Sequence, residues 1–391
     1  MHYLELVKTI DPCAGGVIAG VTALARERNR RGDRTTVASL DAPDFKAGEG
    51  LPFTWVGLGP GRGKYGYAPN YTPWLRQHAA GFDAVIINGL WQYHSFGAWR
   101  ALHDMGIPYL VFPHGMLDPW FRHRYPLKHL KKMLYWWWAD YRVLRDAAAV
   151  CFTCDQERQL ASGSFWPYRA KERVVGYGID EPPPPYPGQI AEFLCHVPAA
   201  AGRRVLLFLS RIHEKKGCDL LLHAFAATCA VDPQWHLVMA GPDDDGSSVR
   251  LQAMATKLGI ARRVSWPGML SGAGKWGAFR SAEAFCLPSH QENFGLVVAE
   301  ALACGCPVLT TDQVNIWREV VDGGAGLAGA DTVDGVTSLL SRWIASGESG
   351  ARIYRSQARP TFLKNFHIAA ASARIGSLIS RPSAQAGLVP A

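Results

Sequence analysis

No run of about twenty uncharged apolar residues occurs in the chain of 391 residues, so we expect no membrane-spanning helix. Lysines and arginines are not gathered into a run like the basic arms that bind nucleic acid. No short-period repeat appears, and the one low-complexity tract is a short proline-rich segment. The N-terminus has an acid within a short apolar run and no basic segment before it. We therefore expect a first strand there and no signal peptide.

The cysteines do not form the pattern of a metal site. Cys151 and Cys154 have the spacing of half a zinc site, but the nine cysteines include no second pair with suitable spacing. We therefore expect buried free thiols and a cytoplasmic location. The formal net charge of +8 is dispersed along the chain, and it fits an anionic substrate, an anionic membrane face or neither.

Length and alternation predict two domains of one class. A hydrophobic content of 48% is ordinary for a globular protein, and the chain is too long for one core. Both halves alternate short apolar runs with helical segments, which predicts two doubly wound α/β domains. The expected strands of the first half are residues 3–7, 35–40, 84–88 and 109–112, and the short segments 174–175 and 178–179 close that half. The expected strands of the second half are residues 204–210, 235–240, 263–266, 284–287 and 307–310.

The segments between these strands also carry predictions. Residues 17–31 have helical periodicity, and a helical tail is expected from about 359 to 380. Residues 41–73 are rich in glycine and proline and are expected to form long loops. The proline run of residues 180–188 indicates a stiff interdomain linker.

One stretch of the second half combines a strand, a polar loop, a helix and a strand. After the strand at 284–287, Glu292 lies in the loop, and Glu300 lies in a helix expected from Gly295 to Cys304. Loops at the carboxyl ends of parallel strands bind ligands, and a helix N-terminus suits a diphosphate. The two carboxylates can accept hydrogen bonds from hydroxyl groups. The combination predicts a site for a nucleotide sugar.

Two cations follow the first strand of the same half. Arg211 and Lys216 lie in a loop that comes directly after a dense apolar strand. An arginine can contact a diphosphate with a forked geometry, and a lysine supplies a point charge. A solvated basic loop is the alternative, but the preceding strand favours phosphate binding. Further along, Met269 and Leu270 end another strand, where loop backbone could pair with a nucleobase edge.

The first half offers weaker candidates at its own strand ends. Gly15 and Gly16 lie between the first strand and first helix, but their spacing is not that of a dinucleotide-binding loop. His114 follows a later strand and could bond a sugar hydroxyl or move a proton, although a loop histidine bonded to backbone is the blander interpretation. Trp91 and His94 follow the strand before it and are candidates for acceptor contacts.

Two further segments leave alternatives open. The acidic run of residues 241–246 could hold a metal ion, but aspartate and glycine are common in turns, and we favour a turn. Residues 126–138 place Leu127, Leu130, Leu134 and Trp138 on one helical face and Lys128, Lys131, Lys132 and Tyr135 on another. A basic amphipathic helix on an anionic bilayer explains this pattern, and so does an ordinary helix that packs its apolar face on the core.

With these motifs in view, the chain resembles the retaining glycosyltransferases of family 4, the group 1 glycosyltransferases. The resemblance rests on the pair Glu292 and Glu300 within their run, on Arg211 with Lys216, on Gly15 with Gly16, and on the segment 113–115. It implies a GT-B fold: two facing Rossmann-like domains with the active site in the cleft between them. The implied domains are an acceptor domain at 1–185, a linker at 186–203 and a donor domain at 204–358. A final helix at about 359–382 would pack back on the first domain.

The resemblance also implies roles. Glu292 would contact the donor sugar, Glu300 the ribose, and Arg211 with Lys216 the leaving diphosphate. His114 would lie near the reacting carbon, and Gly15 and Gly16 would let a loop close on the phosphate. The remaining implied donor contacts are Met269, Leu270, Asn293, Phe294, Gly295 and Leu296. Departures from the family pattern occur at Asn293, Ser210 and residues 175–180, but none removes a charged group.

The expected reaction is hexose transfer with retention and without a metal or other cofactor. GDP-mannose is slightly favoured over a UDP-hexose, from resemblance alone. The expected acceptor is a saccharide, lipid-linked, in exopolysaccharide, capsule or lipopolysaccharide assembly, with peripheral contact at the inner face of the cytoplasmic membrane. A nucleotide-sugar hydrolase or epimerase and a non-catalytic nucleotide-sugar-binding protein are the alternatives. The glycine spacing disfavours a dehydrogenase.

Overall fold

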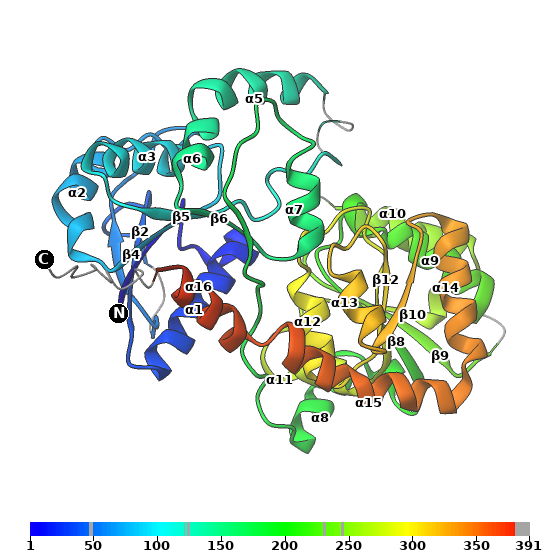
Figure 1. Ribbon diagram of the computed structural model, residues 1–391. Helices are drawn as coiled ribbons and strands as arrows, with labels where there is room; N and C mark the ends of the chain where they lie inside the picture. The colour runs from blue at the N-terminus through cyan, green and yellow to red at the C-terminus, as the bar shows by residue number, and fades with distance from the viewer. Residues whose placement is uncertain (47–49, 121, 123–125, 230–231, 244–245, 380–391) are drawn as a thin grey trace, which may run out of the picture. The chain divides into compact units, whose positions relative to one another are not determined.

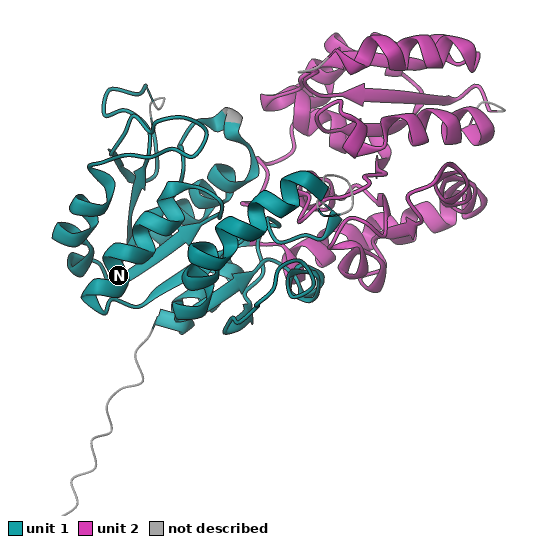
Figure 2. Ribbon diagram, turned by 90° about the horizontal axis from the view of Figure 1, so that it is seen from above, with its two compact units in different colours: residues 1–178, 368–391 teal, residues 179–367 magenta. Residues whose placement is uncertain are grey.

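The computed structural model describes residues 1–46, 50–120, 122, 126–229, 232–243 and 246–379. The chain divides into two compact units, shown in different colours in Figure 2. Unit 1 comprises residues 1–178 together with the segment that begins at Ile368, and unit 2 comprises residues 179–367. Figure 1 labels most of the elements of both units.

Unit 1 is built on a parallel sheet with helices on both faces. Its described strands pair in the order β3-β2-β1-β4-β5-β6-β7. They are β1 His2–Leu6, β2 Arg34–Ser39, β3 Thr54–Gly57, β4 Ala84–Asn88, β5 Tyr109–Phe112, β6 Ala149–Phe152 and β7 Glu172–Val174. The helices are α1 Gly16–Arg30, α2 Tyr71–His78, α3 Tyr93–Met105, α5 Pro126–Trp138, α6 Asp140–Asp146, α7 Asp155–Ala161 and α16 Ile368–Ile379.

The central strands β4, β5 and β6 are almost wholly apolar and are buried, because both faces of the sheet are covered there. Alternate residues of β4 show this: Val85 and Ile87 join the core cluster that includes residues of α2 and α3. Ala84 and Ile86 join a second cluster, on the face where α1 and α16 pack together.

Unit 2 repeats this plan, with strands in the order β10-β9-β8-β11-β12-β13, all parallel. They are β8 Arg204–Leu209, β9 Trp235–Ala240, β10 Val264–Gly268, β11 Ala282–Leu287, β12 Val308–Thr311 and β13 Gly326–Gly329. The helices are α8 Pro187–His196, α9 Cys218–Thr228, α10 Ser247–Lys257, α11 Gly272–Ser281, α12 Leu296–Ala303, α13 Trp317–Asp322, α14 Val333–Ala345 and α15 Gly347–Asn365.

Strand order reverses once in each sheet, and this places the candidate sites. In unit 2 the reversal lies between β8 and β11, whose following loops carry Lys216 and Glu292. In unit 1 it lies between β1 and β4, followed by the Gly15 loop and by Trp91. Loops at such a switch point diverge to opposite faces and leave room for a ligand.

The structure confirms two doubly wound α/β domains and corrects several details. The segment 41–73, expected to be loop, contains β3 and the start of α2, and β6 and β13 were not expected. The expected linker 186–203 contains α8, which begins at Pro187, packs on α11 and belongs to unit 2. Proline at the first helical position lacks only an N–H that the helix would leave unpaired.

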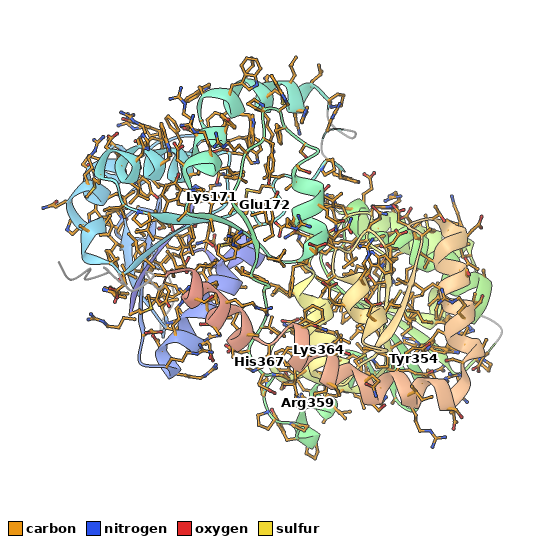
Figure 3. All side chains as sticks on the ribbon, viewed as in Figure 1. Lys171, Glu172, Tyr354, Arg359, Lys364 and His367 are labelled. Carbon is orange, nitrogen blue, oxygen red and sulfur yellow. The ribbon has the colours of Figure 1, made fainter. Side chains whose placement is uncertain are left out.

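The helical tail is two helices and not one. α15 ends at Asn365, and α16 begins at Ile368, where the chain re-enters unit 1. Between them, the Phe366 carbonyl accepts a hydrogen bond from the Ile179 N–H at 3.0 Å. Figure 3 labels Arg359 and Lys364 on α15 and His367 just beyond it. The expected boundary near residue 359 therefore lies within α15, about two turns too early.

Candidate functional site

The loops after β8 and β11 meet almost backbone to backbone in unit 2. Gly217 has a φ of 64°, and a Cβ atom built on it would lie 2.0 Å from the carbonyl oxygen of Pro288. Any side chain at this position would push the two loops apart. Glycine here therefore sets the close spacing of the residues that precede and follow it.

Lys216 and Glu292 form an ion pair across these two loops. The side chains are 10% and 21% exposed, so the pair is largely removed from water. The backbone of Glu292 is fixed from a third loop: its N–H donates to Gln313 and its carbonyl accepts from Asn315, both at 3.0 Å. The lysine ammonium is thus held at the switch point with a carboxylate beside it.

Arg211 lies in the same loop as Lys216 but in a different setting. Its side chain is exposed, and it has no ion pair with any residue that the structure describes. A guanidinium in this position can contact an anion without first leaving another partner. Of the two cations expected to bind phosphate, Arg211 therefore has no ion pair among the described residues, and Lys216 is already paired with Glu292.

The N-terminus of α12 begins directly after the Glu292 loop. Gly295 is its N-cap with a φ of 71°, and no side chain caps the first turn. Phe294 is buried and packs edge-on against Phe366 at 5.6 Å between ring centroids. The Asn293 side-chain oxygen accepts from Asn315 at 3.4 Å. Leu296 starts the helix, so its N–H belongs to the first turn, which can donate to an anion.

A second ion pair lies on the same helix and was not predicted. The Lys275 ammonium, from α11, lies 2.6 Å from Glu300 Oε1. Burial raises the pKa of Glu300, and Lys275 counteracts that increase. Among the described residues no hydrogen-bond donor reaches Glu300 Oε2. Glu300 thus has one paired oxygen and one buried oxygen that no hydrogen-bond donor of the described residues reaches. No sequence pattern pointed to Lys275, which lies in a different loop-helix unit.

The remaining predicted residues of unit 2 lie near the ends of β9 and β10. Met269 is 71% exposed, and Leu270 is buried. In the acidic run, Asp243 accepts hydrogen bonds from Ser248 at the start of α10, which is ordinary turn chemistry. Asp244 and Asp245 lie outside the described residues, so the metal alternative there has no structural account.

The glycine loop of unit 1 is held by an unpredicted tyrosine. Gly15 is the N-cap of α1, which begins at Gly16 without a side-chain cap. The Tyr177 hydroxyl donates to the Gly16 carbonyl at 3.2 Å. A Cβ at Gly20 would lie 1.4 Å from the same hydroxyl oxygen, so only glycine leaves room for this ring. Tyr177 belongs to the segment that departs from the family pattern.

His114 is half-buried in an unusual backbone conformation beside the same tyrosine. Its φ is 50°, and its ring packs edge-on against Tyr177 at 5.6 Å. The Nε2 atom lies 2.9 Å from Oδ1 of Asn88, the last residue of β4. Desolvation lowers the pKa of His114 to about 4, so the ring is neutral at pH 7. A left-handed non-glycine residue is uncommon and often marks a functional loop.

The two acceptor candidates differ in access. His94 is 1% exposed, and its Nε2 lies 2.8 Å from the Asn88 backbone carbonyl, so it supports the end of β4. We make no acceptor proposal for His94. Trp91 is partly exposed with a φ of 71°, and its backbone N–H donates to the Asp140 carboxylate at 2.7 Å. The Lys132 ammonium lies 4.4 Å from the Trp91 ring centroid. Of these two residues, Trp91 is therefore the one whose side chain has exposed surface that an acceptor could contact.

Helix α5 has its leucine face outward. Leu127, Leu130 and Leu134 are 80%, 61% and 70% exposed, while Trp136 is fully buried. Figure 1 shows α5 at the periphery of unit 1, outside α6. The interpretation of an ordinary helix that packs these leucines on the core is therefore wrong. We call Leu127, Leu130, Leu134, Trp137 and Trp138 the α5 apolar face.

The zinc interpretation of Cys151 and Cys154 also has a structural account. Both are buried free thiols, and the Cys154 sulfur accepts the Glu157 N–H as the cap of α7. Within the described residues no group of three or more potential ligands is arranged to hold a metal ion. In the same part of the chain, no helix combines the length and apolarity needed to cross a bilayer.

Two family models match the chain and together cover most of it. Residues 15–178 match the glycosyl transferase 4-like domain, and residues 196–358 match the glycosyl transferases group 1. One similar sequence is a D-inositol 3-phosphate glycosyltransferase of Actinosynnema mirum, 33% identical over 53% of this chain and 51% of the relative. Another of that name, from Stackebrandtia nassauensis, is 26% identical over 87% and 81%. The matches to the first three relatives span about half of their length or less.

Solved structures share the fold across the whole chain. HepE from Anabaena in complex with UDP superimposes with a TM-score of 0.77 over 97% of this chain and 100% of that one, at 20% identity. The same protein was also solved in complex with UDP-glucose. At this identity the likeness establishes the fold alone.

Proposed function

The chain belongs to the group 1 glycosyltransferases, and from that premise we propose that it transfers a hexose from a nucleotide sugar to a hydroxyl acceptor with retention at the anomeric carbon. The observation that carries the proposal is the switch point of unit 2. There Lys216, Glu292 and an exposed Arg211 lie on adjoining loops beside the uncapped N-terminus of α12. Such a set suits a diphosphate joined to a hydroxylated ring.

Each charged group has a proposed task. Negative charge builds on the departing diphosphate, so Arg211, Lys216 and the first turn of α12 would stabilise the transition state. Glu292 would accept from hydroxyls of the sugar, and Glu300, through its unpaired oxygen, from the ribose. Because these cations neutralise the leaving group, we propose that no metal is needed. Same-face attack assisted by the leaving phosphate follows from the family.

The residues of unit 1 enter the proposal with less specific tasks. Gly15 and Gly16 present uncapped backbone at the start of α1, and such backbone suits a phosphate. His114 presents a neutral imidazole, which suits a hydroxyl group. Both remain predictions from the family motif, as do the base contacts of Met269 and Leu270.

For the donor we propose a UDP-hexose ahead of GDP-mannose. The sequence favoured GDP-mannose slightly, by resemblance alone. The similar structure of HepE was solved in complex with UDP and with UDP-glucose instead. A thermal-shift screen of UDP, GDP and ADP tests this order, since a ligand that binds the folded state raises its melting temperature. A shift in melting temperature with GDP alone would instead favour GDP-mannose as the donor.

The activity itself is tested with Arg211→Ala. Loss of a charge-assisted contact to the leaving group is expected to lower turnover by about tenfold to a hundredfold, from ~1.5–3 kcal/mol. Folding should be unchanged, because Arg211 is exposed. Arg262→Ala is the matched control, because that exposed arginine directly precedes β10 and so lies at the amino ends of the parallel strands, away from the site at their carboxyl ends. Wild-type turnover in Arg211→Ala would contradict the proposal.

One further assay distinguishes transfer from the alternative functions. A hydrolase releases free hexose from a labelled UDP-hexose at the same rate with and without acceptor, and an epimerase returns an isomeric donor. A non-catalytic binding protein shifts in melting temperature with the donor but never consumes it. Transfer to an acceptor hydroxyl is the outcome that the proposal requires.

We also propose that the α5 apolar face docks on an anionic bilayer, where a lipid-linked saccharide acceptor would be found. The exposed face is apolar, Lys128 and Lys131 beside it are also exposed, and residues 119–139 contain no acid. Trp166, at 72% exposure, accepts a hydrogen bond through its carbonyl from Trp137 and extends the apolar surface. Apolar insertion combined with basic flanks is the chemistry of an interfacial helix.

The double variant Leu130→Gln with Leu134→Gln tests the membrane proposal. Each leucine is expected to contribute about tenfold to vesicle binding, from ~1.5–3 kcal/mol for full burial of a leucine side chain, scaled by its exposure. Flotation with vesicles containing phosphatidylglycerol should therefore weaken by about a hundredfold. Ile353→Gln on α15, 63% exposed, is the matched control. Equal flotation of both variants and the wild type would refute the proposal.

A further inference from the structure

His114 is held in its unusual conformation from two sides, and the first is the backbone. The next residue, Gly115, also has a positive φ, of 74°. Its N–H donates at 2.6 Å to Oε1 of Glu157, a buried carboxylate at 4% exposure. The other oxygen of Glu157 accepts from the N–H and hydroxyl of Thr153. Two consecutive left-handed residues are thus fixed by one side chain of α7.

The second side is the ring, which ends a buried chain of polar groups. His114 Nε2 contacts Asn88 Oδ1 at 2.9 Å, and Asn88 Nδ2 contacts Glu5 Oε2 at 2.6 Å. Glu5 Oε1 in turn accepts from Arg28 Nη1 at 2.7 Å, with both side chains 1% exposed. The chain therefore runs from α1 through β1 and β4 to the loop after β5.

The chemistry of this chain fixes the direction of every hydrogen bond. Arginine remains protonated, so Glu5 is the carboxylate that balances it, and a carboxylate can only accept. Asn88 must therefore present its NH₂ group to Glu5 and its oxygen to His114. An amide oxygen also only accepts, so His114 Nε2 must carry a hydrogen. Because the ring is neutral at pH 7, its Nδ1 then has a lone pair.

We propose that Asn88 is a positioning residue: with Glu5 and Arg28 behind it, it fixes His114 as the Nε2–H tautomer, so that Nδ1 accepts a hydrogen bond from a ligand hydroxyl. Among the described residues no hydrogen bond involves Nδ1, and the side chain is half-buried, not enclosed. That the ligand is the donor sugar rests on the proposed function. The tautomer itself does not.

The tautomer is measured by long-range ¹H–¹⁵N correlation in histidine-labelled full-length protein. His94 is an internal reference, because its Nε2 bonds to the backbone carbonyl of residue 88, which no side-chain change removes. In the wild type both rings should be Nε2–H. In Asn88→Ala, His114 should become a mixture of tautomers while His94 stays unchanged. A wild-type His114 protonated on Nδ1 would overturn the proposal, and this result needs no variant to fold. An unchanged His114 in Asn88→Ala would also overturn it.

Binding of UDP-glucose and of UDP separates positioning from a general structural effect. Asn88→Ala should weaken UDP-glucose binding by about threefold to tenfold, the value of one neutral hydrogen bond, and leave UDP binding unchanged. Equal loss for both ligands would indicate a structural role and would refute positioning of the sugar. If the wild type binds neither ligand, the proposed donor is wrong while the tautomer result stands. Thr72→Val is the control for the loss of a buried hydrogen bond elsewhere, because Thr72 of α2 is buried and bonds Tyr93, outside this polar network.

Discussion

Replacing Glu292 by glutamine should tighten the binding of free UDP while lowering sugar transfer. In the donor-free protein the Lys216 ammonium is committed to Glu292, so a diphosphate must compete with the carboxylate for it. Glutamine keeps the shape and removes the charge. Lys216 would then be available, and the repulsion between Glu292 and the phosphates would be gone.

The expected gain in UDP binding can be estimated from how far the Lys216–Glu292 ion pair is buried. Fully exposed pairs contribute up to about 1 kcal/mol, and breaking a fully buried pair costs about 3–5 kcal/mol. At 10% and 21% exposure this pair lies between, and part of its free energy returns as hydration of the freed lysine. We expect a net gain of ~1–2 kcal/mol, which is about fivefold to thirtyfold in the dissociation constant of UDP.

Titration calorimetry with UDP on four proteins measures this gain: wild type, Glu292→Gln, Lys216→Gln and the double variant. The gain should vanish when Lys216 is also removed. Glu283→Gln serves as the control, since Glu283 pairs with Arg204 at 2.6 Å near the start of β11, away from the site. If Glu292→Gln binds UDP with the same affinity as the wild type or more weakly, the Glu292 carboxylate and the diphosphate do not compete for Lys216.

Two further predictions concern stability. Lys275→Ala leaves Glu300 buried without its cation, so it should lower the melting temperature of unit 2 by about 2–10 °C, from ~1–3 kcal/mol, and weaken UDP binding. Scanning calorimetry with and without UDP checks this, and an unchanged melting temperature would contradict the ion pair. The pKa values of His94 and His114 are lowered to about 4 by burial, whereas the unfolded chain binds these protons near 6.5. Their contribution to stability should therefore be complete above pH 6.5 and fall between pH 6.5 and 4. Asp140 acts in the opposite sense, because burial raises its pKa to about 7 from 3.8. In urea unfolding from pH 8 to 4, the free energy of unfolding should accordingly fall more steeply in Asp140→Asn than in the wild type. A shallower fall would contradict the raised pKa of Asp140.

Among the strands that the sequence identified, the best placed are dense apolar runs. β4, β5 and β9 begin and end where expected, because parallel strands covered on both faces need continuous apolar residues. β13 was missed because Gly326–Gly329 contains two glycines, which weaken any strand propensity. β3 was missed because it lies inside a segment dominated by glycine and proline.

The site residues divide in the same way. Glu292, Arg211 and Lys216 could be found because they follow strong strands within short loops. Lys275 and Asn88 could not, since each acts through a partner that is distant in sequence: Glu300 is 25 positions from Lys275, and Glu5 is 83 from Asn88. Pairing between loops and strands is a property of the fold, and single-sequence patterns do not contain it. The orientation of α5 was open for the same reason, because an amphipathic pattern does not say which face is covered.

The discontinuity of unit 1 has a consequence for the order of events during synthesis. Ile368 and Ile375 of α16 belong to the same buried cluster as Tyr3, Leu24 and Ile86. These residues leave the ribosome only after all of unit 2, residues 179–367, has emerged. Unit 2 is continuous and can fold as soon as it is made. The domain that begins the chain is therefore the last to complete its core, and a fragment ending at Gly178 would expose the apolar surface that α16 covers.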